Sequence, residues 1–315
     1  MDREQWLGQR RSGIGGSDIA PIMMLSPWRS ALEVYAEKRG LVEPPEDSAL
    51  FEWGRRLEEP IAQKYAEVHG VELYNPGRLF RHEKYEYAIA TPDRLVVGNS
   101  RGVEIKTASR TDGWGEAATD EVPEYYRAQC EWYMFVLGLS VWDLAVLFLF
   151  SREYREYRIH RNEARIEQMN ACAQDFWNHY VLAGVPPQPG PASAPTLAKL
   201  YPRDEGDIGQ ADMAADGDAW ALFRARQRLK DLQDENSLLE NRLKASIGDL
   251  AGIEGRGWKA TWKKAKDRAS VEWEGVARNL AQALGDKGAD ALSRQIEAHT
   301  TTKAGSRVFR IKEEK

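Results

Sequence analysis

The stretch TPDRLVVGNSRGVEIKTAS, residues 91–109, decides the fold of this chain. Its run Val103-Glu104-Ile105-Lys106 alternates apolar and charged side chains, which predicts a strand with Glu104 and Lys106 on one face. Gly-Asn-Ser at 98–100 is a turn signal between two strand-like runs, and Pro92 favours extended backbone at the residue before it. A hairpin of this kind would bring Asp93 beside Glu104.

Two carboxylates side by side repel each other unless a cation lies between them. Residues 91–109 contain no histidine or cysteine, so hard oxygen ligands predict Mg²⁺ or Mn²⁺ as that cation. Lys106 would point into the same site, where it could orient a water or stabilise negative charge. The alternative is a surface hairpin with a Glu–Lys pair, because a Glu-x-Lys triplet alone is a weak signal.

The spacing of Pro92-Asp93 and Glu104-Ile105-Lys106 resembles the signature of the PD-(D/E)XK nucleases. Within that superfamily, residues 6 to about 183 are similar to the YqaJ-type phage recombinases, the lambda exonuclease family. Five motifs occur in the family's order and are together far more specific than any one of them. They are Trp6-x-x-x-Arg10 with Gly13-Ile14-Gly15-Gly16-Ser17-Asp18, Trp53-Gly54-x-x-x-Glu58, Ala90-Thr91-Pro92-Asp93, Glu104-Ile105-Lys106, and Gln129.

The resemblance implies roles for the residues of the hairpin. Asp93, Glu104 and the backbone carbonyl of Ile105 would coordinate the metals. Lys106 would position or activate the attacking water. Together they would carry out an in-line displacement at a phosphodiester, with metal ions stabilising the attacking and leaving oxygens.

Two further residues are implied to complete the metal shell. Glu58 would approach the metals directly or through water, although it could equally be a solvated glutamate like its neighbour Glu59. Gln129 would make a hydrogen bond that fixes water or phosphate near the metals. The alternative for Gln129 is a buried amide bonded to backbone.

The opening motif predicts a pocket for a DNA end. Glycines allow a backbone to approach a phosphate, Ser17 is a good helix N-cap, and a helix N-terminus favours anions. An ordinary capped turn is the alternative. In the related exonucleases the matching Arg and Ser hold the 5′-phosphate, which implies this role for Arg10 and Ser17. Arg11 is a competing candidate, and only the spacing from Trp6 favours Arg10.

The activity that the resemblance implies is a Mg²⁺-dependent exonuclease of the alkaline type on linear double-stranded DNA. It would resect 5′ ends and leave 3′ overhangs for a single-strand annealing protein of the Beta/RecT type, as a homotrimer around DNA. A structure-specific or restriction-like endonuclease on the same fold is one alternative. A catalytically silent DNA-binding module is another.

Composition sets outer limits on these hypotheses. The 315 residues include 44 basic and 49 acidic side chains, a net charge of -5, which argues against a generic nucleic-acid coat but not against a nuclease with a basic groove. Cys130 and Cys172 are too few for a Cys₄ iron–sulfur site. The N-terminus has no apolar signal region and no apolar run approaches about 18 residues, so we expect a cytoplasmic phage or prophage protein without membrane contact.

The order of elements predicts an α/β fold, a restriction-endonuclease-like core with a central mixed β-sheet flanked by helices, plus a C-terminal α/β appendage. We expect an exonuclease domain at 1–185, a proline-rich linker at 186–202, and a region of uncertain role at 203–315. Helices are expected at 30–39, 52–69, 125–137 and 162–183, and strands near 71–81, 86–90, 93–97, 102–107, 141–150 and 154–160.

The region after the prolines carries a heptad pattern of leucines between 222 and 250, with Asn236 at an interior position. It predicts either a coiled coil or a long amphipathic helix packed on its own domain. Beyond it we expect strands at 258–264 and 307–312, with two helices between them at about 271–284 and 286–299.

Overall fold

The computed structural model describes residues 8–43, 48–264 and 272–300 of the chain. The chain divides into two compact units, Met1–Pro202 (unit 1) and Arg203–Lys315 (unit 2). Trp6 and the predicted strand at 307–312 lie outside the described residues.

A five-stranded mixed sheet forms the centre of unit 1, with strand order β1-β4-β5-β6-β7. The strands β5 and β6 run parallel, and the other neighbours are antiparallel. A separate two-stranded sheet pairs β2 with β3. The strands span Leu73–Tyr74 (β1), Phe80–Arg81 (β2), Ile89–Ala90 (β3), Arg94–Val96 (β4), Arg101–Ala108 (β5), Val141–Phe148 (β6) and Glu153–His160 (β7).

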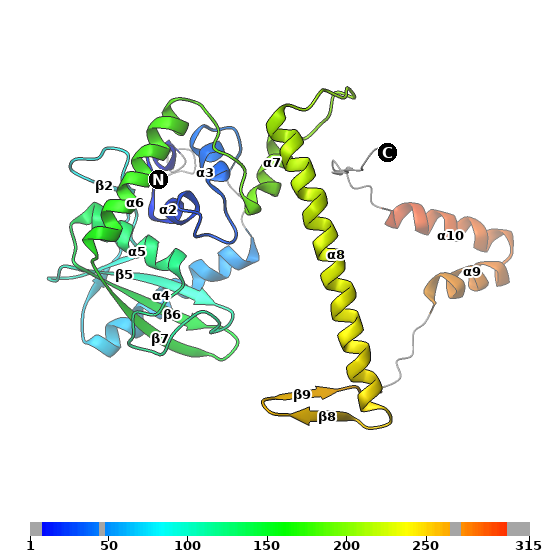
Figure 1. Cartoon of the computed structure of the whole chain (residues 1–315). Coiled ribbons are helices and arrows are strands. Elements are labelled where there is room, and N and C mark those ends of the chain that lie inside the picture. The colour runs from blue at the N-terminus through cyan, green and yellow to red at the C-terminus, as the bar shows by residue number, and fades with distance from the viewer. Residues whose placement is uncertain (1–7, 44–47, 265–271, 301–315) are drawn as a thin grey trace. The chain divides into compact units, whose positions relative to one another are not determined.

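Helices cover both faces of the central sheet (Figure 1). Helix α4 packs Ile61 and Tyr65 against Val103 and Ile105 on one face. Helix α5 covers the other face and lies in the larger core with α2 and α6. The helices of unit 1 span Gly16–Ile22 (α2), Ala31–Lys38 (α3), Ala49–His69 (α4), Glu124–Leu137 (α5), Glu163–Asp175 (α6) and Ala194–Leu200 (α7), with π-helical residues Phe176–Leu182 following α6.

The predicted α/β core with a mixed sheet flanked by helices is confirmed. Local signals explain several boundaries: Ser30 accepts the Glu33 N–H at the start of α3, and Asn162 accepts the Arg165 N–H at the start of α6. Gly70 ends α4 with φ 60°, a left-handed conformation that favours glycine.

The proline-rich segment differs from the linker that the sequence predicts at 186–202. Residues Pro191–Ser193 form a 3₁₀ turn and α7 follows directly, with Pro195 in its first turn. Proline is tolerated there because the first N–H groups of a helix have no intrahelical partner. Leu197 and Leu200 pack against the core of unit 1, so this segment belongs to unit 1. Where the chain can be cut into working domains remains a prediction.

Unit 2 contains a long helix, a hairpin and two shorter helices. They span Met213–Ile247 (α8), Gly252–Gly255 (β8), Trp258–Thr261 (β9), Trp273–Ala283 (α9) and Asp286–His299 (α10). The predicted helices at 271–284 and 286–299 are thereby confirmed, and the strand predicted at 258–264 is present but ends at Thr261. Leucines of the heptad pattern are exposed on α8, among them Leu229 and Leu232, and both hypotheses for this helix stay open. Among the described residues, no helix combines the length and apolarity that a membrane crossing requires.

Candidate active site

The hairpin of β4 and β5 brings Asp93 to the middle of β5. Arg94 pairs with Val103 and Leu95 with Gly102. Asp93 is the residue before Arg94, so it lies just outside the paired residues, next to the part of β5 that follows Val103. The Asp93 carboxylate accepts a hydrogen bond from the N–H of Ile105 at 2.9 Å. The predicted approach of Asp93 to the Glu-Ile-Lys triplet is therefore present in the fold.

Glu104 is buried beneath α5, with a side chain 1% exposed. Lys106 Nζ lies 2.5 Å from its Oε1, as the alternation of β5 predicts for two residues on one face. Gln129 Nε2 on α5 donates to the same oxygen at 2.6 Å. The other oxygen, Glu104 Oε2, is buried without a hydrogen-bond partner. One carboxylate oxygen is thus held by two donors, while the other accepts no hydrogen bond.

Burial and the neighbouring charge of Asp93 raise the pKa of Glu104 to about 8, despite the opposing effect of Lys106. Burial disfavours the charged form of Lys106, but Glu104 and Asp93 outweigh it and raise the pKa of the ammonium group. The site therefore holds a cationic lysine and a carboxyl that binds a proton readily at neutral pH. A divalent cation would compete with that proton, because it satisfies both carboxylates at once.

The donors at this place fit a cation that prefers oxygen ligands. The N–H and C=O of one residue in a strand point to the same side, so the Ile105 carbonyl is directed to the edge where Ile105 N–H meets Asp93. Throughout the described ranges, no group of three or more His, Cys, Asp or Glu side chains forms a metal cluster. The remaining positions around a bound cation would then be water or substrate oxygens.

Glu58 lies near the site but is held by an arginine. Arg94 Nη1 lies 2.5 Å from Glu58 Oε1 and donates to the backbone oxygen of Asp93 at 2.7 Å. Its Nη2 donates to Glu59 Oε2 at 2.9 Å. The two adjacent glutamates therefore share the guanidinium of Arg94. Among the described residues, no hydrogen bond or ion pair joins Glu58 to Glu104. Arg94 was not predicted to take part in the site, although a charged residue within an apolar strand is a signal for a buried partner.

An aromatic stack supports Gln129 and, through it, Glu104. Gln129 Nε2 also donates to the hydroxyl of Tyr133 at 3.0 Å. The ring of Tyr133 packs on Trp142 with centroids 5.1 Å apart. Trp142 in turn lies across Gly102, where a Cβ would collide with the indole. This series of contacts holds the amide in place beside the carboxylate, whereas the sequence predicted that Gln129 binds water or phosphate or is bonded to backbone.

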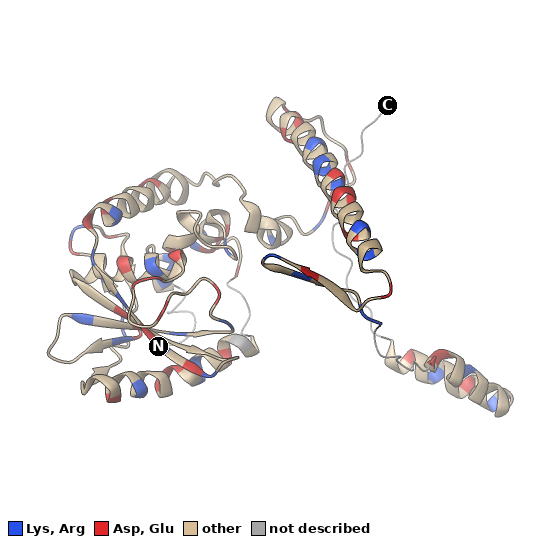
Figure 2. Ribbon diagram, turned by 60° about the horizontal axis from the view of Figure 1, so that its bottom comes forward, with Lys and Arg blue, Asp and Glu red and all other residues tan. Residues whose placement is uncertain are grey.

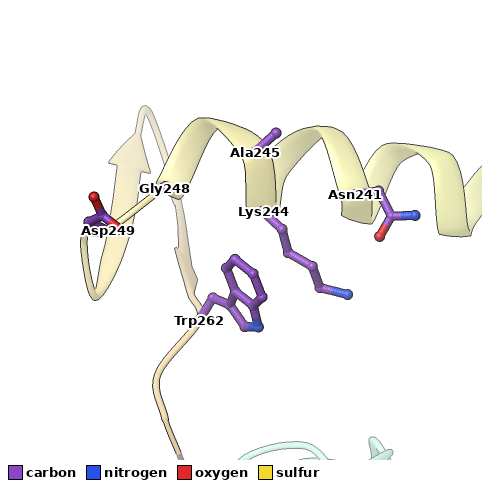
Figure 3. Close-up of a pocket in the computed structure, with 6 residues that line it drawn as sticks. All are labelled: Asn241, Lys244, Ala245, Gly248, Asp249 and Trp262. Carbon is purple, nitrogen blue, oxygen red and sulfur yellow. The ribbon is translucent and has the colours of Figure 1, made fainter.

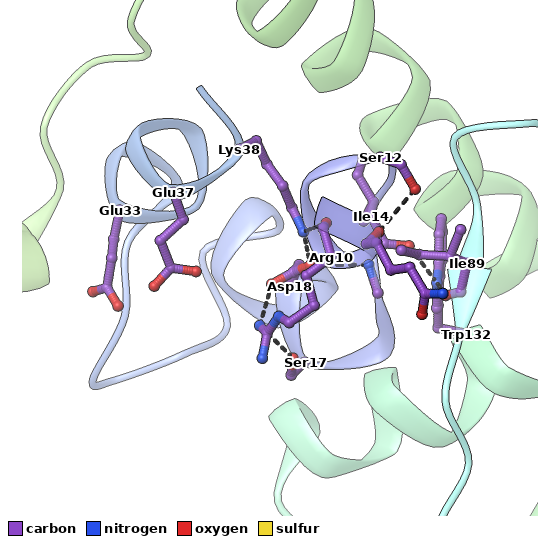
Figure 4. A network of polar contacts seen from close by, with 12 residues as sticks. Arg10, Ser12, Ile14, Ser17, Asp18, Glu33, Glu37, Lys38, Ile89 and Trp132 are labelled. Carbon is purple, nitrogen blue, oxygen red and sulfur yellow. Dashed lines mark hydrogen bonds and ion pairs between the residues drawn. The ribbon is translucent and has the colours of Figure 1, made fainter. Parts of the chain in front are cut away.

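The residues predicted to bind a DNA end converge on a buried carboxylate (Figure 4). Asp18 accepts the Gly15 N–H at 2.9 Å and lies 2.6 Å from Lys38 Nζ. Arg10 Nη2 and Arg29 Nη1 each lie 3.5 Å from its Oδ1. Burial opposes the charge of Asp18, but these three cations outweigh it and hold the pKa of the carboxyl well below its usual range.

Arg10 and Ser17 lie together, as the resemblance implies. Arg10 Nη2 is 3.5 Å from Ser17 Oγ, and Lys38 Nζ donates to the Arg10 carbonyl at 2.7 Å. Arg11 instead contacts Glu43 at 3.4 Å. The structure thus places Arg10, and not its neighbour, beside Ser17.

One expectation for the opening motif is wrong. The N-cap of α2 is Gly15, and Ser17 lies inside the first turn. Gly13 and Gly16 serve close packing: a Cβ at Gly13 would come within 2.5 Å of the Tyr87 carbonyl oxygen, and one at Gly16 within 2.5 Å of the Tyr133 ring. Gly16 therefore brings the start of α2 against α5, which carries Gln129.

Lys38 and Arg29 were not predicted as parts of this cluster. Lys38 is twenty residues from Asp18 in sequence, and local patterns carry no information about such a pairing. Arg29 is further bound by Glu33 and Glu37 at 2.9 and 2.8 Å. Of the three cations, Arg10 has the most exposed side chain, which suits it to contact a ligand.

Comparison with known proteins identifies the class of this chain. A family model described as a YqaJ-like viral recombinase domain matches residues 5–140. The protein YqaJ of Bacillus subtilis (strain 168) is 30% identical over 271 residues, which cover 84% of each chain. The chain therefore belongs to the YqaJ-like viral recombinase family. This membership confirms the resemblance to the YqaJ-type recombinases that the sequence motifs indicate.

Solved structures with similarity to the chain include two exonucleases. An alkaline exonuclease, LHK-Exo from Laribacter hongkongensis, is 21% identical with a TM-score of 0.48, covering 58% of this chain and 94% of that one. A phage-related exonuclease from Haemophilus somnus 129PT is 13% identical with a TM-score of 0.43, covering 55% and 96%.

Proposed function

We propose that the protein is a metal-dependent nuclease that degrades linear double-stranded DNA from its 5′ ends and leaves 3′ single strands. One observation carries this proposal. Asp93 and Glu104 meet beside one strand, Lys106 contacts the same carboxylate, and Glu104 Oε2 is buried without a partner. Membership of a viral recombinase family supports DNA as the substrate.

Asp93, Glu104 and the Ile105 carbonyl would hold Mg²⁺ or Mn²⁺. Such a cation, when bound, stabilises charge on phosphate oxygens and lowers the pKa of bound water. Glu58 would contribute through water, since its carboxylate is shared with Arg94.

The other residues bind and orient. Lys106, cationic and fixed on Glu104, would hold the attacking water and offset negative charge at the phosphate. Gln129 keeps the Glu104 carboxylate in place. Arg10 would grip a terminal 5′-phosphate with its guanidinium fork, assisted by the Ser17 hydroxyl.

The biological setting follows from the same proposal. A 3′ single strand is the substrate of annealing proteins, so we propose a partner of the Beta/RecT type in the cytoplasm of a bacterial host. We also propose a homotrimer that encloses the duplex and thereby stays on it during resection.

A digestion assay on linear duplexes with 5′-phosphate or 5′-hydroxyl ends tests the proposal. With Mg²⁺, the parent should degrade 5′-phosphorylated duplexes and leave covalently closed circles intact, and a chelator should stop the reaction. Asp93→Ala, Glu104→Ala and Lys106→Ala should each abolish cleavage, whereas Glu59→Gln, a change at an exposed carboxylate, should not. Gln129→Ala should lower turnover about 10- to 100-fold, as is typical for a residue that orients a metal ligand.

Two outcomes would reject the proposal. Equal cutting of circles and linear duplexes would indicate an endonuclease. A parent protein that binds DNA yet cleaves nothing with Mg²⁺ or Mn²⁺ would indicate a catalytically silent module.

A further inference from the structure

Unit 2 carries a local concentration of positive charge in an acidic chain. Residues 242–264 contain six basic side chains and two acidic ones, Asp249 and Glu254, whereas the whole chain has a net charge of -5. Figure 2 shows basic residues on the β8–β9 hairpin and on α8. The basic side chains are Arg242, Lys244, Arg256, Lys259, Lys263 and Lys264.

Two tryptophans lie among these charges. The β8–β9 register pairs Gly255 with Trp258, and the N–H of Trp262 continues the ladder by donating to the Ala251 oxygen at 3.1 Å. Trp258 begins β9 and Trp262 follows the end of that strand at Thr261, so each tryptophan has a lysine next to it in sequence, Lys259 and Lys263. Both indoles are about half exposed, at 50% and 54%.

The local structure holds each ring in place. Trp258 lies across Gly255, where a Cβ would come within 2.7 Å of the indole. Trp262 lines a pocket beneath the end of α8 together with Asn241, Lys244 and Gly248 (Figure 3). Rigid rings that remain half exposed offer stacking surface at little further cost in conformational entropy.

We propose that this hairpin is a binding site for single-stranded nucleic acid, separate from the nuclease site. Exposed aromatic rings beside lysines are the combination that binds single strands, because bases stack on the rings and phosphates meet the cations. A duplex keeps its bases stacked inside and cannot offer them to the indoles. Protein interfaces are depleted in lysine, so the charges here favour a nucleic acid over a protein partner.

Binding of single strands by the full-length protein tests this inference. A fluorescein-labelled oligothymidylate of about 20 nucleotides, longer than the site of one small binding fold, would be titrated in EDTA, where cleavage is prevented. Trp258→Leu and Trp262→Leu should each weaken binding about tenfold or more. Trp258→Phe and Trp262→Phe should restore most of it, since phenylalanine also stacks.

A matched control is available in α9. Trp273 is 73% exposed but stands between Glu272 and Glu274, so Trp273→Leu should leave the affinity unchanged. Lys263→Ala should reduce the slope of log affinity against log salt by about 0.7, the value for one phosphate contact with a single strand. An oligouridylate of equal length shows whether the natural strand is DNA or RNA.

Two results would overturn the inference: hairpin variants that bind the oligonucleotide as tightly as the parent, or an equal loss in Trp273→Leu. The hairpin variants should still degrade linear duplex with Mg²⁺, because none of the proposed catalytic residues lies in unit 2. If the parent protein does not cleave DNA, the proposed nuclease function is rejected but the proposed binding site on the hairpin is not. The two proposals can therefore fail independently.

Discussion

Replacing Glu104 with glutamine should stabilise the metal-free protein, and by more at alkaline than at acidic pH. Glu104 is buried beside Asp93, which raises its pKa from 4.5 to about 8. When the pKa of a carboxyl is higher in the folded than in the unfolded protein, the folded protein binds the extra proton at pH values between the two pKa values. Stability is therefore lost as the pH rises from 4.5 to 8.

The size of the effect follows from the pKa shift. At about 1.4 kcal/mol per pKa unit, ionising Glu104 costs the folded protein roughly 5 kcal/mol above pH 8. Glutamine carries no charge, and its oxygen can still accept from Lys106 and Gln129 as Glu104 Oε1 does. Its amide would occupy the position of Oε2, which has no partner in the parent, and could donate to Asp93. The stability difference between variant and parent should therefore shift in favour of the variant by about 3 kcal/mol between pH 5.5 and pH 9.

Urea denaturation of parent and Glu104→Gln in EDTA, at about pH 5.5 and pH 9, measures this difference. Glu59→Gln is the matched control and should show no gain that increases with pH, because its carboxylate is exposed. Adding Mg²⁺ at the higher pH should stabilise the parent but not Glu104→Gln. The assignment of a strained carboxylate pair would be refuted if the difference in unfolding free energy between Glu104→Gln and the parent were the same at both pH values. It would also be refuted if Glu104→Gln were less stable than the parent at pH 9.

Three more predictions concern unit 1. Gly16→Ala should lower the free energy of unfolding by about 1–3 kcal/mol, because its Cβ overlaps an aromatic ring; a stability equal to the parent's in denaturant titration would contradict this. Arg10→Ala should reduce discrimination between 5′-phosphate and 5′-hydroxyl duplexes roughly ten- to hundredfold, the effect of one charge-assisted contact, while Arg11→Ala retains it; equal behaviour in initial-rate assays would remove Arg10 from the pocket. A chain ending at Pro202 should remain folded and keep metal-dependent cleavage. A chain ending at Gly184 lacks α7 and should have a lower melting temperature in circular dichroism. Equal melting temperatures for the two chains would show that α7 does not stabilise unit 1.

Much of unit 1 could be predicted because its signals are local. Alternation in β5 gave the shared face of Glu104 and Lys106, and the turn at 98–100 brought Asp93 to them. Gly70 marked the end of α4 through its left-handed backbone. Such features depend on residues only a few positions apart.

What could not be predicted depends on distant pairings. Glu58 is separated from Arg94 by 36 positions, and no pattern around it shows that a guanidinium is shared with Glu59. Lys38 looks like the last residue of an ordinary helix, yet its ammonium group is buried against Asp18. Burial of a charge is decided by tertiary packing, which a local sequence pattern does not describe.

The stack of aromatic rings behind Glu104, the carboxylate proposed to be catalytic, limits how the family can diverge. Trp142 fits over Gly102, Tyr133 packs on Trp142, and the Tyr133 hydroxyl accepts the amide that also holds Glu104. A mutation that enlarges residue 102 would displace an indole before it affected any group near DNA. Descendants could then restore activity only by shrinking the ring at 142. Relatives should therefore inherit positions 102 and 142 as a pair.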